Sequence, residues 1–159
     1  MNLFGLMETS GSAMQAERMR AEVVATNMAN AETTRTESGG PYRRQMVVFA
    51  ANQGDSGFVT SLSDAANQNI ARLPAPGSQG DATAGVHIAA VVEDSAPPLK
   101  RYDPGHPDAG PDGFVSYPDI NPLTEMVDLM GATRAYGLNG SAVQAEKSMI
   151  SSALEIAKT

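Results

Sequence analysis

The sequence predicts an α+β fold in which two long terminal helices flank a small β-rich insert. Apolar or small residues recur at alternating steps of four and three in residues 3–30, and at nearly alternating steps of four and three in residues 122–159, which indicates two amphipathic helices. Between them, short runs rich in β-branched and aromatic residues alternate with stretches rich in Gly and Pro, a pattern typical of strands and turns. We therefore expect helical segments at residues 1–34 and 121–159, a β-rich insert at residues 35–120, and pairing of the helices in the manner of a coiled coil.

The first helix is predicted for residues 3–30. One line along it is formed by Leu3, Met7, Ser10, Met14, Glu17, Ala21, Val24 and Met28. This spacing is typical of a coiled-coil seam, whose positions contact a partner helix. Glu17 is the charged residue on the line, and two interpretations stay open for it. Either its carboxylate lies in water at the edge of the seam, or it forms an ion pair with a basic residue of another chain, such as Arg134 or Lys147.

The insert is predicted to contain four short strands. We expect them at residues 42–50, 85–94, 99–102 and 114–117, after a turn at Gly39-Gly40-Pro41. Residues 51–84 are dominated by Gly, Ser, Asn, Gln, Ala and Asp, so we expect a long flexible loop there. The density of Pro and Gly in residues 102–113 excludes a helix or a central strand and predicts a turn.

The second long helix is predicted to begin at Pro122, with Asn121 as its N-cap. Glu125 and Asp128 place negative charge near the positive end of the helix dipole. The predicted seam of this helix consists of Leu123, Val127, Gly131, Ala135, Leu138, Ala142, Ala145, Met149, Ala153 and Ile156. At 1.5 Å per residue the helix would be about 55 Å long, more than a small domain needs. We therefore expect the terminal helices to pair with one another or with neighbouring chains.

Composition excludes several functional classes. The chain has no Cys, so disulfides, thiolate metal sites and Cys nucleophiles are ruled out. The formal net charge is −7, and we therefore expect no nucleic-acid partner, because proteins that bind nucleic acids usually carry a basic face. No apolar run approaches the ~20 residues of a membrane span, so we expect no membrane insertion. The first residues lack the basic start and apolar run of a secretory signal, which leaves a cytoplasmic protein or export without a cleaved signal.

The sequence offers little material for a catalytic or metal site. His87 lies in a predicted strand and His106 in the Pro-rich turn, where a metal site would need carboxylate partners such as Asp103 and Asp108. We expect a turn there and no metal ion, and we expect no cofactor. The pairs Arg43-Arg44 and Lys100-Arg101 are interpreted as solvated charges. Paired carboxylates for sugar hydrolysis remain an open alternative.

Motifs along the chain are similar to those of one known family. Residues 27–30, Asn-Met-Ala-Asn, followed by Thr33, are similar to the Asn-Leu-Ala-Asn…Thr signature of flagellar rod and hook proteins. Residues 41–49 resemble the first strand of that family, and the runs 125–127, 134–136 and 147–149, with Asn139, resemble its C-terminal helix. The segment 96–118 resembles the proximal-rod members more than their siblings, through a turn motif of Tyr102, Pro104, Gly105 and Pro107. The chain departs from the pattern at Met28, at Glu32 and in the length of residues 51–84.

The resemblance to the axial proteins of the bacterial flagellum implies a structural subunit and not an enzyme. It implies a place in the proximal rod, the part of the periplasmic drive shaft that transmits motor torque for motility, with terminal helices that fold on assembly. The implied partners are other rod proteins, the rod–MS-ring adaptor, further copies of the chain, and the type III export apparatus, which needs no cleaved signal. The alternatives are a sibling rod or hook protein, a coiled-coil adaptor outside the flagellum, and a cell-wall hydrolase.

The resemblance also indicates which residues should contact neighbouring subunits. The expected assembly interface consists of Leu3, Met7, Met14, Val24, Asn27, Met28, Asn30, Val127, Arg134, Tyr136, Leu138, Asn139, Met149 and Ile156. Asn27 and Asn30 either only cap the first helix or lock the following turn against an adjacent subunit. Gly137 and Gly140 are either tolerated, at ~1 kcal/mol each, or allow neighbouring backbones to approach closely.

Overall fold

The computed structural model describes residues 3–52 and 85–158, and it confirms the α+β fold. The elements are α1 (Leu3–Ala29), β1 (Gln45–Ala51), β2 (Val86–Glu93), β3 (Leu99–Tyr102), β4 (Phe114–Tyr117) and α3 (Pro122–Ile156). The predicted loop at residues 51–84 lies outside the described residues except for its first two positions, of which Ala51 belongs to β1.

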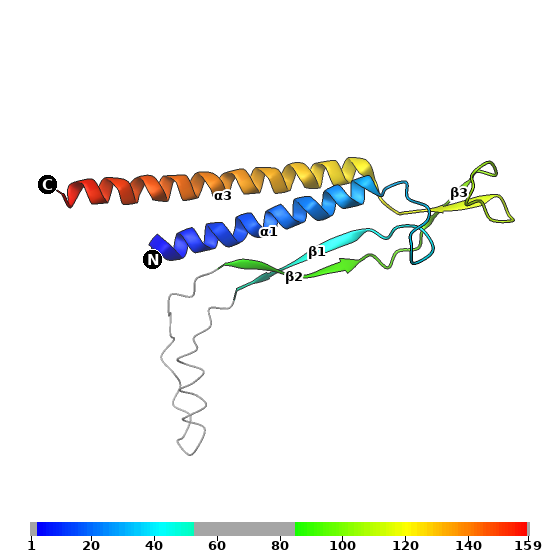
Figure 1. Ribbon diagram of the computed structural model, residues 1–159, viewed down its shortest axis with the longest axis horizontal. Coiled ribbons are helices and arrows are strands. Elements are labelled where there is room, and N and C mark those ends of the chain that lie inside the picture. The colour runs from blue at the N-terminus through cyan, green and yellow to red at the C-terminus, as the bar shows by residue number, and fades with distance from the viewer. Residues whose placement is uncertain (1–2, 53–84, 159) are drawn as a thin grey trace, which may run out of the picture.

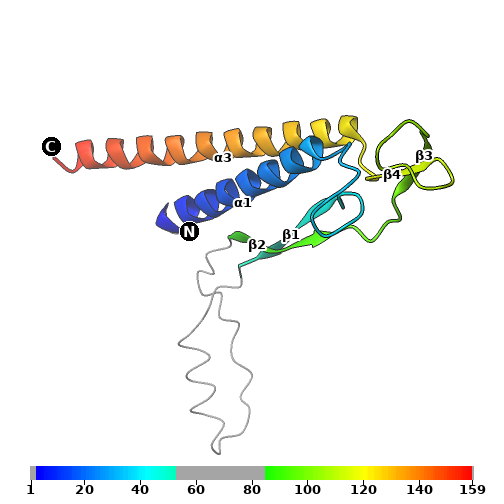
Figure 2. The same ribbon diagram turned by 45° about the vertical axis from the view of Figure 1, so that its right-hand side comes forward.

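Helix α1 is the central layer of the molecule. Figures 1 and 2 show α3 running antiparallel along one side of α1 and the β1–β2 hairpin along another. The β3–β4 hairpin lies beyond the end at which α1 finishes and α3 begins, and the C-terminal end of α3 extends past the start of α1 (Figure 1). The chain therefore has two ends of different character: a junction where all elements converge, and a terminal end made of helices alone.

The start of α3 is fixed by local chemistry. Asn121 has extended backbone angles, and its Oδ1 accepts a hydrogen bond from the Leu123 N–H at 3.0 Å. Pro122 occupies the first helical turn, where its missing N–H leaves no bond unmade. The predicted N-cap and helix start are confirmed.

The four predicted strands form two separate antiparallel pairs. In the first pair Val47 lies opposite Val91, and the register shifts between Val48 and Phe49. This pair begins at Gln45, three residues later than predicted, because the Tyr42 N–H donates to the Thr33 carbonyl at 3.0 Å and holds that stretch against the end of α1.

The β3–β4 hairpin begins and ends at the predicted residues. Its turn requires glycine at position 113, because the backbone there has a φ of +74° and the Cβ of any other residue would lie 2.8 Å from the Tyr102 ring. Tyr102 instead contacts Phe114 edge to face, with ring centroids 5.4 Å apart. Val115 and Ile120 are buried at the base of this hairpin and connect it to the start of α3.

The face of α3 that packs on α1 differs from the predicted seam. The buried residues of α3 are Glu125, Ala132 and Glu146, which are spaced by multiples of seven and therefore share one face. Most residues of the predicted seam lie away from this face: Val127 is 57% exposed and Leu138 66%. The small Ala132 side chain allows close approach of the helices, and the large apolar side chains of the seam are exposed.

Candidate functional site

A cluster of polar side chains joins the helices to the insert at the junction end. Asn27 comes from α1, Tyr42 and Arg44 from the segment before β1, and Glu125 from the first turn of α3. We call these four residues the junction network. Asn27 and Glu125 are each only 1% exposed, so their polar groups must find partners inside the protein.

Asn27 forms hydrogen bonds with every atom of its amide that can form one. Its Nδ2 donates to the Gln45 carbonyl at 2.8 Å and to Glu125 Oε2 at 3.1 Å. Its Oδ1 accepts from the Gln45 N–H at 2.9 Å and from the Tyr42 hydroxyl at 3.1 Å. A neutral amide offers two donors and two acceptor sites, so its capacity is filled. Asn27 is therefore more than a cap: it locks α1 to β1 and α3 of its own chain.

Asn30 has the simpler role of a helix cap. Its Nδ2 donates to the Thr26 carbonyl at 2.9 Å, and its Oδ1 accepts from the Thr33 hydroxyl at 3.1 Å. Both partners lie within four residues of Asn30, so these bonds stabilise only the end of α1. The two asparagines of the sequence motif thus have different roles: Asn27 joins separate elements, and Asn30 stabilises its own turn.

Glu125 is neutralised by Arg44, whose Nε lies 2.7 Å from its Oε1. The interpretation of Arg44 as a solvated charge is wrong, because this side chain is drawn to a buried carboxylate; its neighbour Arg43 is exposed. Asp128, one turn further along α3, lies 3.2 Å from an Arg20 Nη and 3.7 Å from an Arg44 Nη. The acidic start of α3 is thus held by one arginine from α1 and one from the insert.

The interpretation of Glu17 as a residue with its carboxylate in water is also wrong. Its side chain is only 19% exposed, and Oε2 is buried 3.7 Å from an Arg20 Nη one turn later on α1. Arg20 therefore lies between the carboxylates of Glu17 and Asp128. The nearest cation to Glu17 comes from its own chain.

The Tyr42 hydroxyl has its pKa raised above its ordinary value, first by burial and then by the negative charges of Glu93 and Glu125. A raised pKa means that the folded protein favours the neutral phenol, which is also the form that donates to Asn27. The contribution of the neutral Tyr42 phenol to the stability of the fold is complete below the unfolded-state pKa of about 10. It is lost as the pH rises from there through the higher pKa of the folded state.

Replacing Tyr42 by phenylalanine should therefore lower stability by about 1 kcal/mol at neutral pH, the typical net contribution of one hydrogen bond. The variant should also lose less stability than the parent between pH 9 and pH 11, because it lacks the titrating phenol. Urea denaturation followed by circular dichroism across this range tests both effects. Equal alkaline losses in the two proteins would show that Tyr42 does not contribute to this pH dependence.

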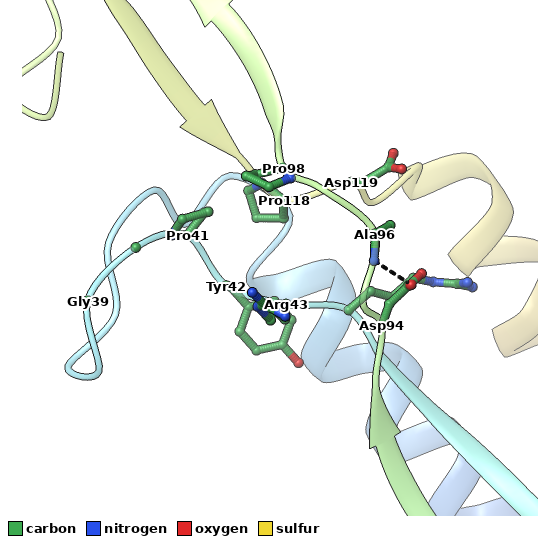
Figure 3. Close-up of a pocket in the computed structure, with 11 residues that line it drawn as sticks. Gly39, Pro41, Tyr42, Arg43, Asp94, Ala96, Pro98, Pro118 and Asp119 are labelled. Atoms are coloured by element: carbon green, nitrogen blue, oxygen red, sulfur yellow. Dashed lines mark hydrogen bonds between the residues drawn. The ribbon is translucent and has the colours of Figure 1, made fainter. Parts of the chain in front are cut away.

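A pocket of about 140 Å³ lies beside the junction network. Figure 3 shows Pro41, Pro98 and Pro118 around it, with Tyr42 and Arg43 on the facing side. The rigid proline rings make it a preformed hollow. Within the described part of the chain, no three His, Asp or Glu side chains gather in a way that could hold a metal ion.

The predicted assembly residues fall into two groups in the structure. Those on α1, and Asn30 directly after it, contribute to contacts within the chain: Val24 and Asn27 are buried, and Met7, Met14, Met28 and Asn30 are half-buried. The side chain of Leu3 lies outside the description. Those on α3 are mostly exposed, namely Val127, Arg134, Tyr136, Leu138, Met149 and Ile156, and Asn139 is half-buried. The turn motif Tyr102, Pro104, Gly105 and Pro107 is exposed at the tip of the β3–β4 hairpin.

Most of the large exposed apolar residues of α3 lie on the side of the helix turned away from α1; Tyr136 and Leu154 are the exceptions. At 100° per residue the other residues fall within one broad face opposite Ala132. We call this face the α3 stripe; it consists of Leu123, Met126, Val127, Met130, Leu138, Met149 and Ile156. Neither described helix has a stretch long and apolar enough to cross a membrane. An apolar face of this length in a chain with so few buried apolar residues is typical of a protein–protein contact.

Two known protein families match this chain, one over its N-terminal helix and one over its C-terminal part. Residues 7–35 match the family described as flagella basal body rod protein, and residues 112–156 match the C-terminal family of flagellar basal body rod FlgEFG proteins. The flagellar basal-body rod protein FlgC of Bacillus subtilis is 38% identical over 99% of this chain and 100% of its own length. The chain belongs to the FlgC family. FlgC of Borreliella burgdorferi is 34% identical over 98% of both chains, and FlgC of Salmonella typhimurium is 35% identical over 94% of both.

The FlgC relatives align along nearly the whole chain, so the family resemblance includes the insert as well as the helices. The matched segment 7–35 contains Asn27, and the matched segment 112–156 contains Glu125. Sequence reasoning missed the roles of Glu125, Arg44 and Tyr42 in joining these segments. One signal was available in the sequence: an acidic residue lies in the first turn of the helix that Asn-Pro begins, where negative charge is favourable. This signal does not identify the arginine that pairs with the acidic residue.

Proposed function

We propose that this chain is a structural subunit of the flagellar basal-body rod, placed in the proximal rod. The relatives that cover its whole length are named as flagellar basal-body rod proteins. In this proposal the terminal segments 1–34 and 121–159 form the helical wall of the shaft, and the insert at residues 35–120 faces outward. The shaft transmits motor torque through packed side chains, so no catalytic group, metal or cofactor is needed.

The observation that carries the proposal is the α3 stripe. Ile156 is 78% exposed, and Val127 and Leu138 are more than half exposed, although each is large and apolar. Removing such side chains from water stabilises a contact by about 1.5–3 kcal/mol each. A neighbouring subunit that covers the stripe would therefore gain a large contact free energy, which suits a shaft that must not slip.

The proposed partners follow from this surface. Further copies of the chain and other rod proteins would cover the α3 stripe, together with the exposed Arg134 and Tyr136. The rod–MS-ring adaptor would meet the chain at one end of the assembly. The subunit would reach the periplasm through the flagellar type III export apparatus without a cleaved signal peptide.

Gly137 and Gly140 support close contacts along the same helix. Nothing in the described structure lies within 4 Å of a Cβ placed at either position, so the chain alone would tolerate alanine at both. Alanine would also favour the helix by ~1 kcal/mol per position. Glycine at these positions is explained if another subunit's backbone occupies that space in the rod.

The double substitution Val127→Glu and Leu138→Glu tests the proposal. Both side chains are exposed, so the substitutions should leave the circular dichroism spectrum of the isolated chain unchanged. In cells that lack the native gene, the variant should be absent from purified basal bodies and swimming should be lost, because a buried unpaired carboxylate opposes assembly.

Thr133→Glu is the matched control, because Thr133 is exposed on α3 between the two test positions but lies beyond the edge of the stripe. It should be incorporated and should support swimming. Motile cells with the double variant in complete basal bodies would overturn the proposed interface. Normal basal bodies in cells that lack the chain altogether would overturn the proposed function.

A further inference from the structure

A groove of about 220 Å³ lies between α1 and α3, near the middle of both helices. Its walls consist of Glu17, Arg18 and Ala21 from α1 and Ala132, Thr133 and Tyr136 from α3. The small alanine side chains leave the space open, and its surface is almost entirely apolar. Grooves of this kind in protein interfaces commonly receive an anchoring side chain from the partner.

Glu17 is the acidic side chain in the wall of the groove, and its charge is only partly compensated. Its Oε2 accepts no hydrogen bond, and the cation beside it is an Arg20 Nη at 3.7 Å. Arg20 also pairs with Asp128, at the shorter distance of 3.2 Å. Arg18 borders the groove as well, but it pairs with Glu22 at 3.0 Å. Because 19% of the Glu17 side chain stays exposed, a further cation can still reach it.

The charges around this part of the helix pair do not balance. Within the described chain, three carboxylates share two guanidinium groups: Glu17, Asp128 and Glu125 share Arg20 and Arg44. Arg44 lies nearest to Glu125, at 2.7 Å. Arg20 lies nearer to Asp128 than to Glu17, so the excess negative charge falls on Glu17. A cation that enters the groove would balance the cluster, whereas an apolar side chain would leave it unbalanced.

Arg134 is a cation in the opposite situation, because it is exposed and forms no ion pair with any described residue. At 100° per residue it lies about 200° around α3 from Ala132, which places it at the centre of the α3 stripe. It therefore points away from the groove of its own chain. A subunit that covers the α3 stripe must receive the Arg134 guanidinium together with the apolar side chains around it.

Arg134 and the groove lie at the same level along α3. Ala132 and Tyr136 are two residues before and after Arg134, or about 3 Å along the helix axis. Two parallel copies placed side by side, with little shift along that axis, bring the Arg134 of one copy to the groove of the other. The stripe and the groove lie on different sides of the chain, so the contact is heterologous and can repeat around a tube.

We propose that the groove is the docking site for the α3 stripe of a neighbouring copy of this chain, and that Arg134 of this copy pairs with Glu17. The contact supplies the cation that Glu17 lacks and covers apolar side chains on both surfaces. It selects Arg134, and not Lys147, as the basic partner of Glu17, because Lys147 lies on another side of α3, about 60° from Ala132. The inference rests on the proposed function, since it requires copies that lie side by side in the rod.

Cysteine cross-linking in purified basal bodies tests the contact, because the chain has no Cys of its own. The double variant Ala21→Cys with Met130→Cys places one thiol in the groove and one on the α3 stripe, one turn before Arg134, and keeps both charged groups. After treatment with a short bismaleimide, covalent dimers and larger multimers of the chain should appear on a denaturing gel. The control, Ala21→Cys with Lys147→Cys, should give monomers, because Lys147 lies outside the stripe.

A suppressor experiment tests the ion pair itself. Arg134→Glu brings two negative charges together and should lower incorporation into basal bodies by about tenfold or more. Adding Glu17→Gln to this variant should recover part of the loss, because it removes the charge that the new carboxylate faces. Glu22→Gln, which neutralises an exposed carboxylate on the same helix, should recover nothing.

The outcomes separate this inference from the proposed function. The docking site is overturned if basal bodies that contain the variant with cysteines at positions 21 and 130 give no cross-linked copies. The ion pair is overturned if Glu17→Gln restores no incorporation, or if Glu22→Gln restores as much. Absence of the parent chain from basal bodies would overturn the proposed function, and this inference with it.

Discussion

Replacing Arg44 by methionine is expected to lower the free energy of unfolding by about 3–5 kcal/mol, the effect of removing one partner of a buried ion pair. Methionine keeps much of the length of the side chain but leaves the Glu125 carboxylate, 1% exposed, without its cation at 2.7 Å. Asp128 also loses one of its two arginine contacts. The start of α3 would then carry uncompensated negative charge against the end of α1.

The change should appear as a fall in the melting temperature on the order of 10 °C, since 1 kcal/mol corresponds to about 2–4 °C in a chain of this size. Arg43→Met is the control: it removes the same charge one residue earlier from an exposed side chain, and it should change stability by no more than about 0.5 kcal/mol. Equal destabilisation by the two variants would mean that net charge, and not the pairing with Glu125, stabilises the junction. The double variant Arg44→Met with Glu125→Gln should recover part of the loss, because it removes the unpaired charge.

Features that depend on neighbouring residues in the sequence could be predicted from it. The N-cap at Asn121, the helix start at Pro122 and the bounds of β3 and β4 agree with the structure because each follows from short-range bonding rules. The predicted seam of α1 also lies on covered faces of that helix, as Val24 shows. Periodicity was sufficient there because small and apolar residues fill most of the line.

The contact face of α3 could not be predicted in the same way. A search for apolar periodicity assumes that buried positions are apolar, but the buried line of α3 contains Glu125 and Glu146. Glu125 is buried because Arg44, 81 residues earlier in the chain, reaches it through the fold. Such long-range pairing cannot be detected in the local spacing of apolar residues. The large apolar residues that the search did find form the exposed α3 stripe.

The same limit applies to the junction network. Asn27 and Tyr42 are 15 residues apart in the sequence, and nothing in the sequence between them indicates that their side chains meet. Only the fold shows that a turn containing Gly39 and Gly40, both with positive φ, returns the chain to the end of α1. The sequence motif thus marked Asn27 as important but did not identify its partners.

Asn27→Ala is expected to be about as destabilising as the loss of Arg44, at about 3–5 kcal/mol, because several buried groups lose their partners together. The Gln45 N–H and carbonyl, the Tyr42 hydroxyl and Glu125 Oε2 each bond to this one amide. Each buried polar group left unpaired costs about 1–3 kcal/mol, and water entering the cavity recovers part of the total. The effect should appear in chemical denaturation and in faster hydrogen exchange at the start of β1.

Asn30→Ala is the matched control, three residues later in the same motif. It removes only the bonds to Thr26 and Thr33 within its own turn, so it should cost about 1 kcal/mol or less. A large difference between the two variants would establish that Asn27 acts as a lock between elements and Asn30 as a cap. Similar small losses would mean that the end of α1, β1 and the start of α3 hold together without the Asn27 amide. The junction would then depend mainly on the ion pair between Arg44 and Glu125, and the Arg44 variant would be the more destabilised of the two.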